Sequence, residues 1–201
     1  SGKNHEKNDS RGGNTVKTRA IALASLNELQ EIVETVEETE LEQMQELILN
    51  SNRIFVGAAG RSLLAMKFLA MRLMQIGLEV CTPSIREGDL LLVGSGSGET
   101  AGMIAICKKA KAAGAEVAAF TKNRNSTIAS IAKVAVQLNT AKPIQEGAAG
   151  PDGWIEGNYF SIRPSGNPFE QSIVIVGDAM VCELMQKTNC GTAKIAYNHA
   201  N

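Results

Sequence analysis

The segment Ser95-Gly96-Ser97-Gly98-Glu99-Thr100 combines residue types that suit binding of an anion. It follows an apolar run and opens a predicted helix, whose first N–H groups favour negative charge. Gly96 and Gly98 let a backbone approach a ligand closely, and Ser95, Ser97 and Thr100 add hydroxyl donors. The spacing fits neither a Walker loop nor a dinucleotide fingerprint. The segment therefore predicts a phosphomonoester site, and the alternative is a plain turn with Ser97 as helix cap.

A second glycine-bearing turn, Gly57-Ala58-Ala59-Gly60-Arg61-Ser62, also follows a predicted strand and opens a helix. Ligands of open parallel sheets bind at the carboxyl ends of strands, where the helix connections diverge. Two such turns on successive strands therefore indicate one crevice. Gly60 would allow close approach, and Arg61 and Ser62 could contact a phosphate or a sugar hydroxyl. The alternative for Arg61 is a surface ion pair.

Two further side chains could move protons. Glu170 lies in the first turn of a predicted helix, where a carboxylate is often only a partner of the helix dipole. His199 is one of two histidines, and the other, His5, lies in the polar N-terminal stretch. An imidazole titrates near neutral pH and suits proton abstraction beside a carbonyl, although a lone histidine is more often structural.

The elements that must position these residues alternate between strand and helix. Hydrophobic periodicity predicts strands over Arg53–Val56, Asp89–Val93, Glu116–Thr121 and Val134–Leu138, and helices over Leu63–Ile76, Thr100–Ala113, Ser126–Ala132 and Pro168–Met185. This order implies a parallel sheet covered by helices on both faces. The Gly- and Pro-rich stretch Ala141–Asn167 predicts a long loop, with an edge strand near Tyr159–Ile162.

Apolar spacing also predicts which helix faces meet the core. Two helices ahead of the first strand form a predicted hairpin, in which Thr39 and Glu42 fit a capping box. The acidic cluster from Glu34 to Glu42 is expected on its solvated side. The residues expected to face the core are Leu26, Leu29, Val33 and Val36, then Leu41, Met44, Leu47 and Ile48, then Leu64, Phe68, Met71 and Met74, and finally Phe169, Ile173, Val176, Met180 and Leu184.

Composition excludes several classes of function. A formal net charge of −1 leaves no basic footprint for nucleic acid, and the apolar runs are too short to span a bilayer. The four cysteines form no CxxC pair, which favours reduced thiols in a cytoplasmic protein. With only two histidines no metal site is expected. Residues 1–19 are interpreted as a disordered tail without a signal peptide, and residues 20–201 as one domain.

Together these segments resemble the sugar isomerase (SIS) domain. The resemblance rests on Ile54–Ser62, Phe68–Met74 and Gly88–Leu91 leading into Ser95–Thr100, and it covers roughly residues 20 to 201. Phe169-Glu170-Gln171-Ser172 after Pro164 and Gly166, Asp178 beyond it, and the ending Asn198-His199-Ala200-Asn201 are similar to the 6-phospho-3-hexuloisomerases of this family. The segment between Leu78 and Pro83 is shorter than in that group.

The resemblance implies a three-layer α/β sandwich with a mostly parallel five-stranded sheet of flavodoxin-like type, preceded by the helical hairpin. It implies conversion of D-arabino-hex-3-ulose 6-phosphate to D-fructose 6-phosphate through a cis-enediolate, in the ribulose monophosphate route of formaldehyde fixation. No cofactor would be needed, and members form tetramers or dimers. Glu170 would be the base and His199 a proton shuttle. The Ser95–Thr100 loop would hold the phosphate, and Arg61 and Ser62 would contact the sugar or the oxyanion.

Two alternatives stay open from the sequence. One is a non-catalytic phosphosugar-binding regulator built on the same domain, although the acidic hairpin ahead of Ile54 is no DNA-binding helix-turn-helix. The other is an aldose–ketose isomerase of the same superfamily that acts on a different sugar phosphate.

Overall fold

The computed structural model describes residues 17–80, 84–140 and 167–190. Its elements, in chain order, are α1 (Thr18–Val33), α2 (Glu38–Asn50), β1 (Ile54–Ala58), α3 (Gly60–Gln75), β2 (Leu90–Gly94), α4 (Ala101–Ala112), β3 (Glu116–Thr121), α5 (Thr127–Ile131), β4 (Val134–Gln137) and α7 (Asn167–Lys187). The predicted alternation of strands and helices is confirmed, with boundaries that differ by at most three residues. The expected edge strand near Tyr159–Ile162 lies outside the described residues.

The sheet is parallel, with the described strands in the order β1-β2-β3-β4. A single parallel bridge joins Ile54 of β1 to Val80, which follows α3, on the other side of β1 from β2. The chain therefore runs from β1 through α3 to one flank and then returns to β2 on the opposite flank. This reversal is the flavodoxin-like pattern, and it places a topological switch point between β1 and β2.

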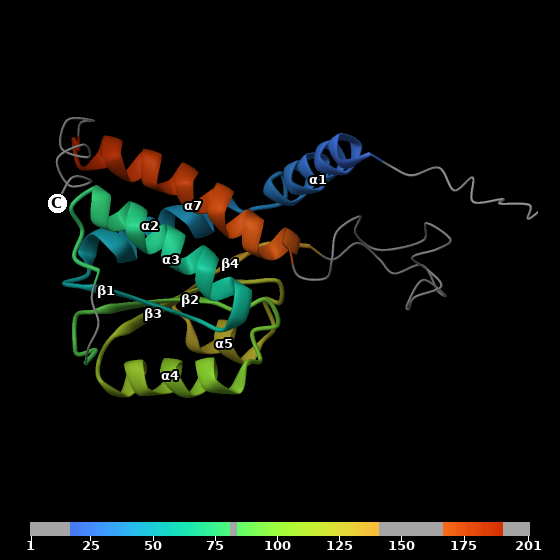
Figure 1. The fold of residues 1–201 in the computed structure, drawn as a ribbon. Coiled ribbons are helices and arrows are strands. Elements are labelled where there is room, and N and C mark those ends of the chain that lie inside the picture. Colours follow the sequence, from blue (N-terminus) through green and yellow to red (C-terminus); the bar gives the residue numbers. More distant parts are fainter. Residues whose placement is uncertain (1–16, 81–83, 141–166, 191–201) are drawn as a thin grey trace, which may run out of the picture.

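Three layers follow from the alternation of side chains along the strands (Figure 1). Leu90, Leu92 and Phe120 point into a core shared with α2, α3 and α7. Leu91 and Val93 point into a second core beneath α4 and α5. Because both faces are covered, β2 is buried along its whole length and reads as a continuous apolar run.

The prediction for the buried face of α3 was wrong. Leu64, Phe68, Met71 and Met74 are 69%, 38%, 58% and 52% exposed, and the buried face is Ala65, Met66, Leu69, Ala70 and Leu73. The reason lies in the close approach of α3 to α7, where a Cβ at Gly177 would stand 3.3 Å from Leu69. Because Gly177 has no side chain, Leu69 can come this close to α7, and the opposite face of α3 is left exposed.

The two N-terminal helices pack on the domain with α7 as a shared neighbour. Helix α1 lies against α7, and α2 lies against β4 and α7 (Figure 1). The predicted core face holds for α2, in which Met44 and Ile48 are buried, and for α7. For α1 it was partly wrong, because Leu29 is buried but Leu26 and Val33 are exposed. The capping box was also wrong, since Thr39 lies inside α2 and Glu37 is the N-cap.

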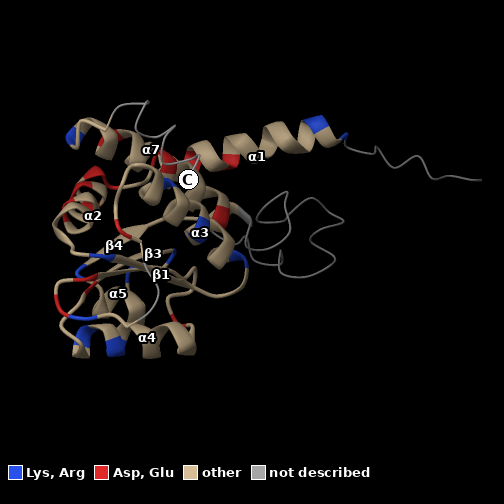
Figure 2. Ribbon diagram, turned by 60° about the vertical axis from the view of Figure 1, so that its left-hand side comes forward, with Lys and Arg blue, Asp and Glu red and all other residues tan. Residues whose placement is uncertain are grey.

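Charge divides between the outer layers. Helix α2 carries four glutamates, whereas the last turns of α4 carry three lysines (Figure 2). One glutamate of α2, Glu40, is not simply solvated. It accepts a hydrogen bond from the backbone amide of Gln137 in β4 at 3.1 Å and forms an ion pair with Arg124 at 2.7 Å. No helix within the described ranges is both long enough and apolar enough to cross a bilayer.

Candidate active site

The switch point brings the two glycine-bearing loops to one edge of the sheet. Ala58 of β1 is paired in register with Gly94 of β2, so the loops that follow both strands leave the sheet side by side. The first loop leads into α3 and the second into α4. The predicted crevice at the carboxyl ends of the strands is thus the place where the chain's connections diverge.

Internal hydrogen bonds hold the Ser95–Thr100 loop in a fixed shape. Ser95 is buried, and its hydroxyl lies 3.1 Å from the Thr100 hydroxyl and accepts from the Gly98 amide at 3.2 Å. Ser97 is exposed, and its hydroxyl accepts from the Glu99 amide at 3.1 Å. The N-cap of α4 is Thr100, without a side-chain cap bond, so the alternative of Ser97 as helix cap is wrong.

Backbone donors in this loop remain available for a ligand. The amide N–H groups of Gly96, Ser97 and Thr100 donate to no acceptor in the part of the chain that the structure describes. They lie just ahead of the 12-residue helix α4, whose dipole adds positive potential. Such a cluster of free N–H groups at a helix start favours an anion, and binding of a phosphate here stays a prediction.

Contacts from α5 fix the far side of the loop. Gly98 has a φ of +68°, and a Cβ there would collide with the Ser126 side chain. Glu99 turns away from the loop and accepts from the amide and the hydroxyl of Thr127 at 2.7 and 2.8 Å. The hydrogen bond from the Thr127 backbone amide, and to a lesser extent the one from the Thr127 hydroxyl, holds the pKa of the Glu99 carboxyl below its usual value. The one carboxylate of the loop is thereby tied to α5.

Helix α7 begins against the same loop. A Cβ on Gly96 would stand 3.4 Å from the Phe169 ring, and a Cβ on Gly94 would stand 3.5 Å from Ile173. The first turns of α7 therefore lie beside the end of β2 and the start of the loop. Glu170, the residue after Phe169, is thus placed next to the crevice.

Arg61 and Glu170 meet across the crevice from elements more than a hundred residues apart in the sequence. The Arg61 Nε lies 3.4 Å from Glu170 Oε1, with the arginine side chain 60% exposed and the glutamate side chain 17% exposed. The second oxygen, Oε2, is buried and has no hydrogen-bond partner among the described residues. A buried carboxylate oxygen without a partner is costly and uncommon, which makes Glu170 a candidate functional group.

The outcome for the other predicted site residues is mixed. Gly60 has a φ of +57° and begins α3 beside Arg61, and Ser62 is half-buried in the same turn. A shallow hollow of about 280 Å³ lies next to Arg61 and Glu170 and continues along Leu64 and Phe68. His199 lies outside the described residues, so its role stays a prediction.

Lys122 is a neighbour of the loop that the sequence analysis did not single out. Its amide donates to the Gly96 carbonyl at 3.0 Å, and its Cε would stand 3.0 Å from a Cβ on Gly96. The signal was present in the sequence, because Lys122 directly follows the third strand and therefore lies at the same edge as both glycine-bearing loops.

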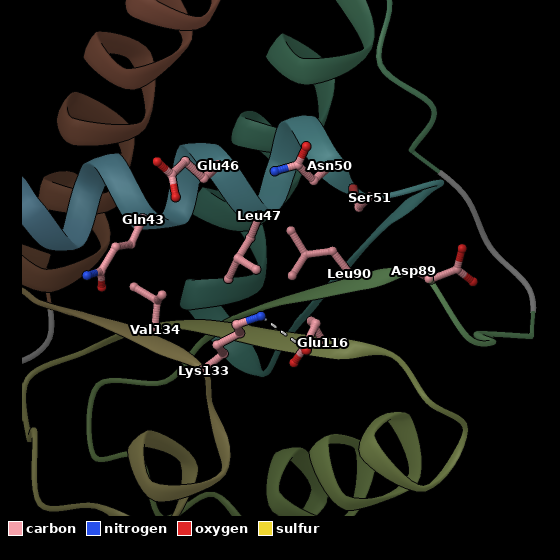
Figure 3. Close-up of a pocket in the computed structure, with 11 residues that line it drawn as sticks. Gln43, Glu46, Leu47, Asn50, Ser51, Asp89, Leu90, Glu116, Lys133 and Val134 are labelled. Carbon is pink, nitrogen blue, oxygen red and sulfur yellow. Dashed lines mark hydrogen bonds and ion pairs between the residues drawn. The ribbon is translucent and has the colours of Figure 1, made fainter.

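A larger hollow lies at the opposite end of the sheet, where the strands begin (Figure 3). It has a volume of about 540 Å³, with Leu47 and Leu90 in its lining and the ion pair of Lys133 and Glu116, at 3.4 Å, at its side. Because it opens at the amino ends of the strands, it is not the crevice that parallel sheets use for ligands. Among the described side chains, no three of His, Cys, Asp or Glu gather as a possible metal site.

Fold and crevice together define a sugar isomerase domain, and comparison with known proteins agrees. The family model described as SIS domain matches residues 79–151. A solved structure from Methanococcus jannaschii superposes with a TM-score of 0.71 at 25% identity, over 90% of this chain and 97% of that one. Its description infers a molecular function of 3-hexulose-6-phosphate isomerase for that protein.

Two relatives that carry this name are more similar to the chain in sequence than that structure is. The protein of Bacillus subtilis (strain 168) named 3-hexulose-6-phosphate isomerase is 35% identical over 92% of this chain and 99% of its own length. The Mycobacterium gastri protein of the same name is 36% identical, over 85% of each chain. The chain therefore belongs to the SIS-domain family, among the relatives named 3-hexulose-6-phosphate isomerase.

Proposed function

We propose that this protein is an isomerase that interconverts D-arabino-hex-3-ulose 6-phosphate and D-fructose 6-phosphate in the cytoplasm, without a cofactor. The observation that carries the proposal is the state of Glu170. One of its oxygens is engaged by Arg61 while the other is buried without a partner among the described residues, next to a loop suited to phosphate. The names of the relatives supply the sugar, and the geometry supports a proton transfer.

The reaction moves a carbonyl from C3 to C2 of the sugar. Glu170 Oε2 takes the proton from C2, and the electron pair of that bond moves to the C3 oxygen, which gives a cis-enediolate over the two carbons; the C3 oxygen then takes up the proton that the C2 hydroxyl releases. Glu170 then returns its proton to C3, and the C2 oxygen, which has lost its proton, becomes the new carbonyl. One base can serve both carbons if it lies over the C2–C3 bond, and His199 is proposed to carry the proton between the two oxygens.

Binding of the phosphate supplies the positioning. The free amides of the Ser95–Thr100 loop and the Ser97 hydroxyl would hold the phosphate, so that the sugar extends toward Arg61 and Glu170. Arg61 would stabilise negative charge on the enediolate oxygens, with Ser62 beside it. Binding energy at the remote phosphate thereby aligns the reacting carbons with the base.

Direct turnover tests the proposal. The 3-hexulose 6-phosphate is generated from ribulose 5-phosphate and formaldehyde with a separate synthase, and fructose 6-phosphate is followed through a coupled dehydrogenase. Product formation that scales with the amount of this protein supports the proposal. Absence of product, while phosphosugars still raise the melting temperature, would contradict it and favour a regulator or another sugar.

We also propose that the chain assembles as a homo-oligomer, either a tetramer or a dimer. The outer face of α3 exposes Leu64, Phe68 and Met71 in one stripe, and a stripe of large apolar side chains is typical of a contact surface. Light scattering on the full chain would give the mass, and Met71→Glu should shift it toward that of a monomer. A monomeric wild-type chain would contradict the proposal.

A further inference from the structure

Lys122 is positioned above the Ser95–Thr100 loop by the backbone of β3. The strand ends at Thr121, and the Lys122 amide donates to the Gly96 carbonyl at 3.0 Å. The Gln137 side chain donates to the Lys122 carbonyl at 3.0 Å, so the residue is held from both sides. Its backbone is therefore fixed even though its side chain is exposed.

The side chain of Lys122 runs across Gly96. Its Cε would lie 3.0 Å from a Cβ at that position, which is tighter than ordinary contact, so the lysine stem lies directly against the backbone of Gly96. Within the described residues, the Lys122 ammonium has no hydrogen-bond acceptor and no carboxylate partner. The nearest acidic residue of the loop, Glu99, is occupied by Thr127. The cation is thus held over an anion-binding loop without a counter-charge of its own.

We propose that Lys122 is a phosphate-binding residue that completes the loop, and that it sets the preference for a phosphorylated over an unphosphorylated sugar. The inference rests on the proposed function, in which this loop holds the substrate phosphate. The loop's own donors are neutral amides and hydroxyls, so Lys122 would add a formal positive charge to it. A charged donor to a phosphate oxygen is about twice as strong as a neutral one.

The test compares Lys122→Met with a matched variant, Lys109→Met. Both remove one exposed lysine, but Lys109 lies in the last turn of α4, away from the loop. Methionine keeps the unbranched stem over Gly96 and removes the charge. Binding of fructose 6-phosphate and of inorganic phosphate is measured by titration calorimetry for both variants, for Lys122→Arg and for the wild type.

We expect the Kd of Lys122→Met for fructose 6-phosphate to rise about tenfold, as for the loss of one charged hydrogen bond. Lys122→Arg should stay within about threefold of the wild type, and Lys109→Met should match it. In the turnover assay KM should rise with kcat nearly unchanged, because the phosphate contact is equal in the ground and transition states. A purely structural role would not be rescued by arginine.

The possible outcomes distinguish a failure of the proposed role of Lys122 from a failure of the proposed isomerase activity. A Kd for Lys122→Met within twofold of Lys109→Met would overturn the role of Lys122 and leave the isomerase intact. A wild type that binds fructose 6-phosphate without turning it over would overturn the isomerase and leave Lys122 to be judged by binding alone. A wild type that binds neither fructose 6-phosphate nor inorganic phosphate would overturn the phosphate loop and Lys122 together.

Discussion

At Glu170 the two carboxylate oxygens lie in different surroundings, and this difference favours the proposed role as a base over that of a helix-dipole partner. A carboxylate that served only the dipole of α7 could remain solvated at no cost. Here Oε1 lies 3.4 Å from Arg61 Nε and Oε2 is buried without a partner among the described residues. An arrangement of this kind costs stability in the free protein, which is expected where a substrate proton is the missing partner.

Replacing Glu170 with Gln should therefore lower kcat by about 10²- to 10⁴-fold, the usual contribution of a general base. The amide keeps the shape of the side chain, so the Kd for fructose 6-phosphate should change by less than about threefold. Stopped-flow or coupled assays and calorimetry measure the two effects. Asp178→Asn is the control, since Asp178 lies two turns further along α7 in an exposed pair with Arg72. Turnover of Glu170→Gln within a few-fold of wild type would exclude it as the base.

At the scale of the elements, the close fit of loop, α5 and α7 around the glycines shapes the site. Gly98→Ala would place a methyl group in the left-handed region and against Ser126, the N-cap of α5. We expect it to lower the free energy of unfolding by about 2 kcal/mol and to weaken fructose 6-phosphate binding at least tenfold.

Gly102→Ala is the matched change one helical turn away. Gly102 lies within α4, and a Cβ there would meet nothing within 4 Å. Alanine should raise the free energy of unfolding by about 0.5–1 kcal/mol, because it restricts the unfolded chain. Urea unfolding compares the two variants, and an equal effect at both positions would show that the contact with Ser126 is unimportant.

Much of this element-level organisation could be predicted from the sequence. The buried runs of β2 and β3 and the glycine-bearing turns after them have periodicity and spacing that permit few alternatives. The buried face of α3 could not be predicted, because that helix is apolar on two sides. Its orientation depends on the close approach of Leu69 to Gly177 of α7, about a hundred residues later. The hydrogen bonds of Glu99 and Glu40 could not be predicted for the same reason, since their partners are distant in sequence.

Across the whole molecule, acid stability should depend on one buried ion pair that ties β1 to β2. The Asp89 side chain is fully buried, and Arg53 donates to its two oxygens at 2.6 and 3.1 Å while the Arg86 amide donates at 2.9 Å. Burial raises the pKa of Asp89, but the bonds from Arg53 and Arg86, with the attraction of both guanidinium groups, outweigh it and lower that pKa below its ordinary 3.8.

Because the pKa of Asp89 is lower in the folded state, ionised Asp89 stabilises the fold fully above pH 3.8. This stabilisation is lost as the pH falls through the lower pKa of the folded state. Asp89→Asn should lower the free energy of unfolding by about 3 kcal/mol at pH 7, since it leaves Arg53 without its charge partner. The difference from wild type should shrink below pH 3.8. Glu116→Gln, in an exposed pair, should cost under about 1 kcal/mol. Chemical unfolding from pH 3 to 7 measures both, and a pH-independent difference would contradict the assignment.

The contact between Glu40 and the Gln137 amide has a consequence for how copies of this chain meet. Among the described strands β4 forms one border of the sheet, and such a border offers free amides to any extended segment that drifts near. Glu40 occupies one of these amides with a carboxylate that Arg124 holds in place. Growth of a continuous sheet from molecule to molecule, the route to fibrils, is therefore obstructed at this border by a negative charge.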